Sequence, residues 1–345
     1  LTEELASVWE SGILTHHGAK VQEFEQRISV LCGKTAVVSC VNGTIALQLA
    51  LRTLSGKGEV ILPSFTWIAT ASAIEYEGFK PIFCDICPET LNIDVSKIEN
   101  LITEKTVAIM PVHVFGQPCD ISHINLIGKK NNIAVIYDAA HAFGSKYNSQ
   151  SVMAQEQISC VSFHATKIIN CGEGGAIFTN SLEKIKKLER LRFFGHDNQK
   201  NLVDEGTNAK LTEIHAALGL CNLRSFDQIL TRRREIDSHY RVGLADVSGL
   251  RFQKIKNNET NYSYFPIILD TPEVAEKLMK RFQLEGIGAR KYFYPSLSKL
   301  ERFNHTHNAT IVSDKISESI ICLPSYFDLE YLEVEKIISV IKAEI

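Results

Sequence analysis

The sequence predicts an α/β protein with a large domain followed by a smaller C-terminal α+β domain. Short apolar runs recur through the first 180 residues, and segments of helical spacing lie between most of them. Strands that alternate with helices predict a mostly parallel sheet flanked by helices. This alternation stops after residue 180, and a strand–helix–strand pattern appears after residue 250. We therefore predict domains over 1–235 and 236–345.

The individual elements follow from the period of the apolar residues. Residues 19–31 show helical spacing, with Val21, Phe24 and Ile28 on one face and Gly33 as a stop signal. Strands are predicted over 36–41, 59–62, 81–86, 107–112, 133–138, 158–163, 176–179, 262–269 and 288–294. Helices are predicted over 19–31, 45–54, 68–77, 181–192, 211–223, 229–244, 272–284 and 329–345.

Composition excludes several classes of protein. The net charge of -3 and the dispersed basic residues give no reason to expect a nucleic-acid partner. No apolar run reaches the roughly 18 residues that span a bilayer, and no signal-peptide pattern opens the chain, so we expect a cytoplasmic enzyme without a membrane partner. The sequence begins at Leu1 rather than methionine, so we expect residues to precede it.

The nine cysteines do not form a recognisable framework. Their number is odd, and most lie within apolar runs, where a reduced thiol is an ordinary core side chain. Cys84 and Cys87 have the spacing of a redox or zinc pair, but no second pair accompanies them. We therefore expect neither disulfides nor a metal site.

Polar residues follow several of the predicted strands. Asn42, Trp67, His113, Asp138 and Lys167 all fall at or just beyond a strand's carboxyl end. In open α/β sheets, ligands bind in the crevice outside these ends. We therefore expect the five side chains to converge on one site.

The candidate for the chemistry is Lys167, which ends the polar segment 162–167. A lysine in such a turn is usually a solvated surface charge. Here Asp138 and the Asn-Gly-Thr turn at 42–44 also follow strands, and a lysine, a buried carboxylate and a phosphate-binding turn together indicate pyridoxal phosphate. A lysine that forms a Schiff base with this cofactor needs a pKa lowered by desolvation or by neighbouring positive charge.

The phosphate of this cofactor would bind at the start of a predicted helix. The N–H groups of Gly43 and Thr44 point out of that helix end, and the hydroxyl of Ser162 lies near the lysine in sequence. An Asn-Gly pair alone is more often only a turn. No Walker lysine motif and no Gly-x-Gly-x-x-Gly follows a strand, which argues against nucleotide hydrolysis and dinucleotide binding.

Four side chains are candidates for contact with the cofactor ring or the substrate. Asp138 would stabilise the protonated pyridine nitrogen, and Trp67 would cover the ring. His141 would contact the phenolic oxygen, and His164 lies beside the lysine segment. Each also has an ordinary structural role: a cap or ion pair for Asp138, and core packing for Trp67 and the histidines.

The chain resembles the sugar aminotransferases of the DegT/DnrJ/StrS group, which are fold type I pyridoxal phosphate enzymes. The resemblance implies that Lys167 is the Schiff-base lysine and that Asn208 reaches the cofactor phosphate of a second subunit, so the active unit would be a homodimer. It gives Asp138, Trp67, Gly43, Thr44 and Ser162 the roles stated above. The motifs that carry the resemblance are 12–15, 42–44, 138–141, 162–167, 172–175, 208–213 and Tyr294-Pro295.

Three departures from the family pattern concern contacts to cofactor and substrate. The family commonly has glutamine where His141 stands and arginine where Lys210 stands. A histidine often follows the Tyr-Pro pair, where this chain has Ser296-Leu297-Ser298. We expect His164 and Tyr294 to contact the substrate, although the missing histidine leaves the sugar contacts of this segment open.

The reaction that the resemblance implies has two halves, in which L-glutamate gives its amino group to the cofactor and a nucleotide-linked keto-deoxysugar then takes it. The pattern around Lys167 is most similar to members that make 4-amino-4,6-dideoxyglucose on dTDP; a UDP-linked sugar stays an alternative. A 3-keto sugar aminotransferase and a non-catalytic cofactor-binding regulator also stay open. A cysteine desulfurase would need Cys171 on a mobile loop, and sugar dehydratases of the group have histidine at the lysine position.

Overall fold

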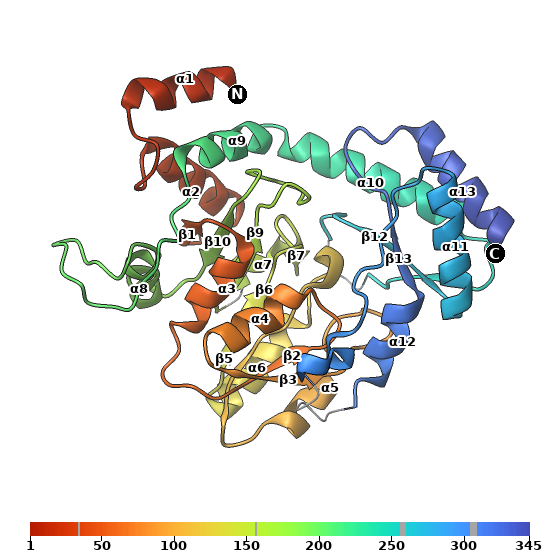
Figure 1. The fold of residues 1–345 in the computed structure, drawn as a ribbon, viewed down its shortest axis with the longest axis horizontal. Helices are drawn as coiled ribbons and strands as arrows, with labels where there is room; N and C mark the ends of the chain where they lie inside the picture. The colour runs from red at the N-terminus through yellow and green to blue at the C-terminus, as the bar shows by residue number, and fades with distance from the viewer. Residues whose placement is uncertain (34, 156, 256–259, 304–308) are drawn as a thin grey trace.

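The computed structural model describes residues 1–33, 35–155, 157–255, 260–303 and 309–345. Figure 1 shows the large sheet-containing part and the C-terminal part side by side, with helices α9 (Glu213–Leu223) and α10 (Phe226–Gly243) running across one edge toward the C-terminal part. None of the described helices combines the length and the apolar character needed to cross a bilayer.

The central sheet consists of two four-stranded parts. One part has the order β3-β2-β4-β5 and is parallel throughout, and the other has the order β1-β10-β9-β6. In the second part β10 runs antiparallel to both neighbours, whereas β6 and β9 are parallel. The strands are β1 (Val37–Cys40), β2 (Glu59–Pro63), β3 (Lys80–Cys84), β4 (Thr106–Ile109), β5 (Ala134–Val135), β6 (Tyr137–Asp138), β9 (Ser159–Ser162) and β10 (Gly175–Phe178).

The predicted strand 133–138 is divided between these two parts. The N–H of Ile136 still donates to Ile109 in the first part, whereas the N–H of Tyr137 donates to Ile158 in the second. A parallel bridge joins Val112 to Asp138, so the two parts meet at this chain segment. The division delivers Asp138 to the junction, where the ends of strands from both parts face one crevice.

Helices cover both faces of the sheet, as the sequence predicts. One buried cluster includes Phe24, Ile124 and Leu220 from α2, α6 and α9, and the other includes Leu47 and Ile74 from α3 and α4. The helices of this part are α1 (Thr2–Ser11), α2 (Ala19–Leu31), α3 (Gly43–Leu51), α4 (Ile68–Tyr76), α5 (Val95–Ile98), α6 (Ile121–Asn131), α7 (Val152–Gln155) and α8 (Leu182–Arg192). Short 3-10 turns lie at Glu99–Leu101, Val114–Gly116, Leu297–Lys299 and Glu301–Phe303, and β7 (Lys146–Tyr147) pairs with β8 (Gln150–Ser151).

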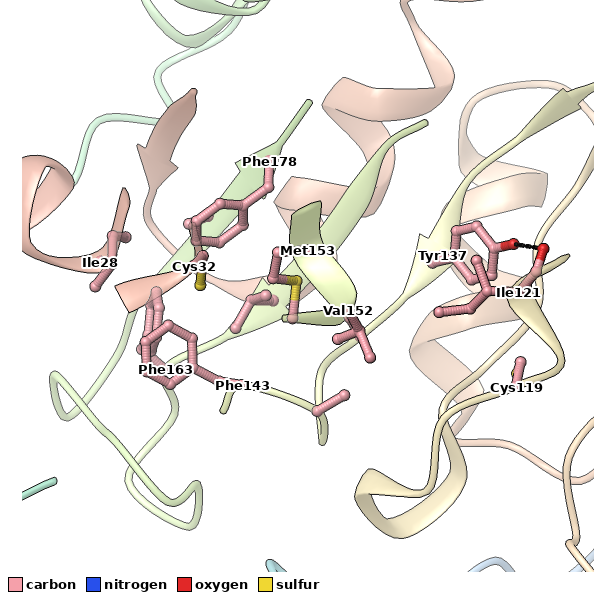
Figure 2. Packing of buried hydrophobic residues seen from close by; sticks show 14 of the residues in the cluster. Ile28, Cys32, Cys119, Ile121, Tyr137, Phe143, Val152, Met153, Phe163 and Phe178 are labelled. Carbon is pink, nitrogen blue, oxygen red and sulfur yellow. Dashed lines mark hydrogen bonds between the residues drawn. The ribbon is translucent and has the colours of Figure 1, made fainter. Parts of the chain in front are cut away.

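The residue after the β9 end fixes the lysine segment to this core. Phe163 is fully buried, and its ring packs edge-on against Phe143 at 5.4 Å and Phe24 at 5.2 Å. Figure 2 shows Phe143 and Phe163 side by side, with Phe178 and Ile28 in the same group of buried side chains. Because burying an aromatic side chain of this size stabilises the fold by about 2–3 kcal/mol, the turn that follows Phe163 has a rigid base.

The C-terminal part is an antiparallel sheet covered by helices. Its strands β11 (Leu250–Phe252), β12 (Phe265–Leu269) and β13 (Ile320–Leu323) have the order β11-β12-β13. Helices α11 (Pro272–Leu284), α12 (Ile311–Ser319) and α13 (Tyr331–Glu344) accompany α10. The predicted domain boundary at 235/236 falls inside helix α10. The division of the chain into these two domains remains a prediction.

The predicted strand 288–294 is wrong. Only an isolated bridge joins Arg290 to Cys322, and the third strand of this sheet is 320–323 instead. The four residues of β13 are all buried, whereas 288–294 includes the charged Arg290 and Lys291, which the interior of a sheet does not accommodate.

Candidate active site

A cavity of about 360 Å³ lies at the carboxyl ends of the central strands. Its volume falls in the range typical of small-molecule sites. It is bordered by loops that follow β1, β2, β6 and β9, and by a segment of the C-terminal part. Eight of the ten predicted site residues line it: Gly43, Thr44, Trp67, Asp138, His141, Ser162, His164 and Lys167.

Lys167 is largely removed from water. Its Nζ donates a hydrogen bond of 3.3 Å to the hydroxyl of Tyr264. Burial lowers the pKa of this lysine from 10.5 to about 8, although the charge of Asp138 acts in the opposite direction. A substantial fraction of the amine is therefore neutral and nucleophilic near pH 8.

Asp138 is a buried carboxylate that lines the same cavity. Its Oδ2 accepts a hydrogen bond of 2.7 Å from Thr70, and its Oδ1 accepts one of 3.1 Å from the N–H of Ala140. Burial raises the pKa of Asp138, and these hydrogen bonds and the charge of Lys167 oppose the rise. Within the described residues no ion pair closer than 4.0 Å joins the carboxylate to Lys167, and both line the same cavity.

The start of α3 forms the anion-binding edge of the cavity. Asn42 caps the helix, because its Oδ1 accepts from the N–H of Ile45 at 2.9 Å. A Cβ atom at Gly43 would lie 2.8 Å from the Cβ of Ser162, so only glycine allows the helix start to approach β9 this closely. The free N–H groups of this first turn favour an anion such as a phosphate.

His141 has a buried ring nitrogen without a partner. Its side chain is 8% exposed, and its Nδ1 makes no hydrogen bond within the described structure. The ring packs against Tyr264 at 4.6 Å and stacks on Phe293 at 5.8 Å. Burial and the charge of Lys167 lower the pKa of His141 well below 6.5, so the ring is neutral. An unsatisfied polar atom beside a cavity fits a ligand that supplies its hydrogen bond.

Trp67 and His164 both line the cavity and are both partly open to solvent. Trp67 is 55% exposed, and its ring meets that of Tyr292 edge-on at 5.9 Å, so Trp67 can offer a flat surface to a ligand. The Nδ1 of His164 lies 2.9 Å from the hydroxyl of Thr166, which orients the imidazole along its own loop.

Two predicted site residues do not line the cavity. Asn208 lies on an exposed loop, where its Oδ1 accepts a hydrogen bond of 2.5 Å from Lys210. Tyr294 is 57% exposed. His113 also departs from the expected convergence of strand ends, because it is fully buried, stacks on Tyr137 at 5.3 Å and accepts from the N–H of Cys119.

The C-terminal part supplies cavity residues that sequence patterns did not reveal. Tyr264, Arg290, Tyr292 and Phe293 all line the cavity. The clustering of aromatic residues at 292–294 is a signal for Tyr292 and Phe293, which the predicted strand obscured, whereas no local pattern marks Tyr264 or Arg290. Thr70, the partner of Asp138, lies on α4, and no local pattern marks it.

Cys171 is unsuited to nucleophilic chemistry. It is fully buried, and burial raises the pKa of its thiol to about 12. A Cβ at Gly219 would lie 2.6 Å from its Sγ, so the thiol is tightly enclosed. The cysteine desulfurase alternative requires an accessible, reactive thiol and is therefore wrong on physical grounds.

The family model of the DegT/DnrJ/EryC1/StrS aminotransferases matches residues 1–342. The chain belongs to this family. It is therefore an aminotransferase, and the aminotransferases of this family depend on pyridoxal phosphate. The family resemblance that the sequence indicated is confirmed.

Several relatives and solved structures resemble nearly the whole chain. A dTDP-4-amino-4,6-dideoxy-D-glucose transaminase of Shigella dysenteriae is 39% identical over 347 residues, covering 98% of this chain and 94% of its own. A UDP-2-acetamido-2-deoxy-3-oxo-D-glucuronate aminotransferase of Pseudomonas aeruginosa is 33% identical, covering 90% and 86%. DesI, solved in the presence of its TDP-sugar product, superposes with a TM-score of 0.95 at 30% identity over 99% of this chain and 88% of its own.

A second structural comparison bears on the cofactor. A Streptococcus pneumoniae protein assigned as a sugar aminotransferase and solved in its PMP form has a TM-score of 0.93 at 27% identity, covering 99% of this chain and 96% of its own. The predicted fold class, a large α/β domain of aminotransferase type with a smaller α+β domain, is confirmed by these superpositions.

Proposed function

We propose that this aminotransferase binds pyridoxal phosphate and transfers the amino group of L-glutamate to the keto carbon of dTDP-4-dehydro-6-deoxy-D-glucose. The observation that carries the proposal is the pair formed by the desolvated amine of Lys167 and the buried carboxylate of Asp138, which border one cavity. The transaminases of Shigella dysenteriae and Escherichia coli, at 39% and 36% identity, support the choice of sugar.

The residues around the cavity fit the cofactor. Gly43 lets the start of α3 approach β9, which brings the N–H of Thr44 and the hydroxyl of Ser162 to one edge of the cavity, where a phosphate would bind. Asp138 would hold the pyridine nitrogen, and the unpartnered Nδ1 of His141 would meet the phenolic oxygen. Trp67 would cover one face of the ring and exclude water there.

Bound pyridoxal phosphate supplies a carbonyl carbon that takes up the amino group and a ring that accepts electrons. Lys167 then serves as the acid and base. Near pH 8 its amine can remove a proton from the substrate carbon and deliver it to the carbon that takes up the amino group. Thr70 donates to the Asp138 carboxylate and fixes its orientation, in which its charge would stabilise a protonated ring nitrogen. His141 stays neutral and does not compete with Lys167 for the proton.

The proposal includes a homodimer. Asn208 lies outside the cavity of its own chain, on an exposed loop together with Lys210, whose Nζ also lies 4.5 Å from the ring of Phe194. A side chain in this position can serve the phosphate site of a second copy, as the family pattern implies. His164 and Tyr294 would contact the sugar nucleotide, in keeping with the half-exposed position of each.

The second candidate is amination of a 3-keto sugar nucleotide. The observation that favours it is the Pseudomonas aeruginosa relative, whose name specifies a 3-oxo sugar. The position of the new amino group distinguishes the two candidates. A non-catalytic cofactor-binding protein would accept the amino group of glutamate but pass it to no sugar.

The test is an absorbance experiment on purified protein followed by product analysis. With pyridoxal phosphate, the wild-type protein should show a visible band that L-glutamate bleaches and dTDP-4-dehydro-6-deoxy-D-glucose restores. Lys167→Ala should lack the band, whereas Lys184→Ala, which removes a partly buried lysine of α8 remote from the cavity, should behave as wild type. Nuclear magnetic resonance of the product should place nitrogen at carbon 4. The absence of an amino sugar from this substrate, with amination of a 3-keto sugar nucleotide offered separately, would overturn the proposal in favour of the second candidate.

A further inference from the structure

A second cavity, of about 910 Å³, adjoins the first one. The two cavities share five bordering residues, which include Lys167, Tyr264 and Arg290. The second cavity lies between the segment that follows Lys167, the start of α10, and loops of the C-terminal part. Its volume is large enough for a sugar nucleotide or for an amino acid with several water molecules.

Arg233 of α10 borders this cavity and is an unusual buried cation. The residue as a whole is only 7% exposed. Its Nη1 donates to the main-chain oxygens of Ser263 at 2.9 Å and Ser325 at 2.8 Å, and its Nε is buried without any partner. Within the described residues no carboxylate lies within 4.0 Å of the guanidinium. Arginine is rarely buried in this way unless an anion accompanies it.

Three acids line this cavity: two of them, Glu285 and Glu333, are engaged elsewhere, and the third, Asp328, is exposed. Glu285 pairs with Arg281 at 2.7 Å and with Lys336 at 3.3 Å. Glu333 accepts from the N–H of Glu330 at 2.9 Å in the cap of α13. The neighbouring Arg232 has Glu235 at 3.3 Å. Arg233 therefore differs from its neighbours: its charged guanidinium donates to main-chain carbonyl groups and has no carboxylate partner among the described residues.

Arg290 supplies a second guanidinium without a carboxylate partner in the described structure. Its Nη1 donates to the hydroxyl of Tyr292 at 2.8 Å, and it borders both cavities. The carbonyl that Arg233 contacts belongs to Ser263, which precedes Tyr264, and Tyr264 contacts the amine of Lys167. Arg233 thus contacts the residue next to Tyr264, and Tyr264 accepts the hydrogen bond of the Lys167 amine.

We propose that the second cavity is a substrate site in which Arg233, assisted by Arg290, binds an oxyanion. This inference rests on the proposed function, because that function supplies two substrates that carry such a group: the carboxylates of L-glutamate and the diphosphate of the sugar nucleotide. Guanidinium groups bind both kinds of oxyanion through paired, charge-assisted hydrogen bonds. The bound oxyanion neutralises Arg233 and holds the rest of the substrate toward Lys167.

Binding of unreactive probes separates the two sources. Isothermal titration calorimetry of the cofactor-loaded protein would use glutarate, a dicarboxylate that cannot give up nitrogen, and dTDP, with thymidine as its uncharged counterpart. Arg233→Gln should weaken the binding of glutarate or of dTDP at least tenfold and leave thymidine unaffected. Arg233→Lys should recover part of the loss, because it keeps the charge but not the paired donors. The matched control is Arg234→Gln, which removes an adjacent exposed arginine that packs on Tyr262.

A weaker glutarate interaction assigns the site to the amino donor, and a weaker dTDP interaction assigns it to the sugar nucleotide. Unchanged affinity for both probes in a folded Arg233→Gln protein overturns the inference. Arg233→Gln could melt well below the wild type because it loses the hydrogen bonds to Ser263 and Ser325. In that case Arg290→Gln is the deciding variant. Binding of one probe that is at least fivefold weaker in Arg290→Gln supports the site, and wild-type affinities for both probes overturn it. Probe binding that depends on Arg233 in a protein without transaminase activity would refute only the proposed function.

Discussion

The amine of Lys167 donates a hydrogen bond to the hydroxyl of Tyr264, which lies 97 residues further along the chain. The segment that carries Tyr264 is held against the central sheet by Asn261, whose Nδ2 donates to the main-chain oxygens of His141 at 2.7 Å and Phe143 at 2.8 Å. A Cβ at Gly116 would lie 2.1 Å from the Oδ1 of Asn261, so glycine is required where this segment docks. The position of the reacting amine thus depends on the C-terminal part as well as on its own turn.

We expect Tyr264→Phe to lower the pKa of Lys167 further. Burial keeps the phenol neutral by raising its pKa, and the phenol oxygen accepts from the amine, so it favours the charged lysine. A hydrogen bond worth about 1 kcal/mol corresponds to somewhat less than one pKa unit. The measurement is the pH dependence of the rate at which cofactor-free protein captures pyridoxal phosphate. The midpoint should move downward in Tyr264→Phe and stay in place in Tyr76→Phe, an exposed control; an upward shift would contradict the assignment.

Lys167→Met should stabilise the cofactor-free protein. The native state binds the lysine proton less tightly than the unfolded chain does, since burial lowers the pKa from 10.5 to about 8. The penalty is therefore fully present below pH 8 and disappears as the pH rises toward 10.5. We expect a gain of up to about 3 kcal/mol in the free energy of unfolding at pH 7. Urea unfolding of both proteins across this range tests it, and a gain that grows with pH would be inconsistent with a buried cation.

The sequence predicted helices well where the local signals agree. The bounds 19–31 and 272–284 match α2 and α11. Apolar spacing marks α2, and in α11 the structure adds a cap at Thr271 and Pro272 in the first turn, which mark the same end. The C-terminal sheet was harder to predict. The sequence predicts a strand at 288–294 and none at 320–323, whereas the structure pairs 320–323 with β12, because the spacing of apolar residues does not reveal which of two segments pairs with that strand.

The candidate site shows a similar division. The sequence identifies Lys167, Asp138 and Ser162 because each lies at or just beyond the carboxyl end of β6 or β9, which run parallel, so the architecture itself makes them converge. Tyr264, Arg233 and Arg290 were not found, because they reach the cavities through the packing of the C-terminal part against the sheet. That packing depends on contacts such as those of Asn261, which no local pattern in the sequence records.

Asp138→Asn should separate stability from function. Burial raises the pKa of this carboxyl above its ordinary 3.8, so the charged form destabilises the cofactor-free native state at neutral pH, and this penalty vanishes only at acid pH. Asparagine keeps the shape but has no charge, so the cofactor-free variant should melt at or above the wild-type temperature at pH 7. Its affinity for the cofactor should fall about tenfold or more, since the ring nitrogen loses its counter-charge. Wild-type affinity in this variant would exclude Asp138 as the partner of the ring.

The two tryptophans of the chain allow a direct test of ring stacking. Trp67 lines the cavity, whereas Trp9 lies on α1 outside the residues that line it, and both are more than half exposed. In Trp9→Phe, binding of pyridoxal phosphate should quench most of the remaining fluorescence, and in Trp67→Phe it should change little. Trp67→Ala should weaken cofactor binding by about 1 kcal/mol, the usual contribution of an aromatic pair. Equal quenching in both phenylalanine variants would place the cofactor away from Trp67.

His141 gives a pH-dependent prediction that distinguishes a neutral ring from a charged one. Burial and the charge of Lys167 lower its native pKa well below 6.5, so the unfolded chain binds more protons than the native state once the pH falls below about 6.5. Wild-type stability should therefore decline with falling pH in that range, and His141→Gln should show a shallower decline. Because glutamine also offers a neutral hydrogen-bonding group, this variant should keep most of the transaminase activity, whereas His141→Ala should lose at least tenfold. The measurements are melting temperature against pH and the rate of glutamate bleaching; the same acid slope in wild type and His141→Gln would show that the imidazole is protonated in the native state.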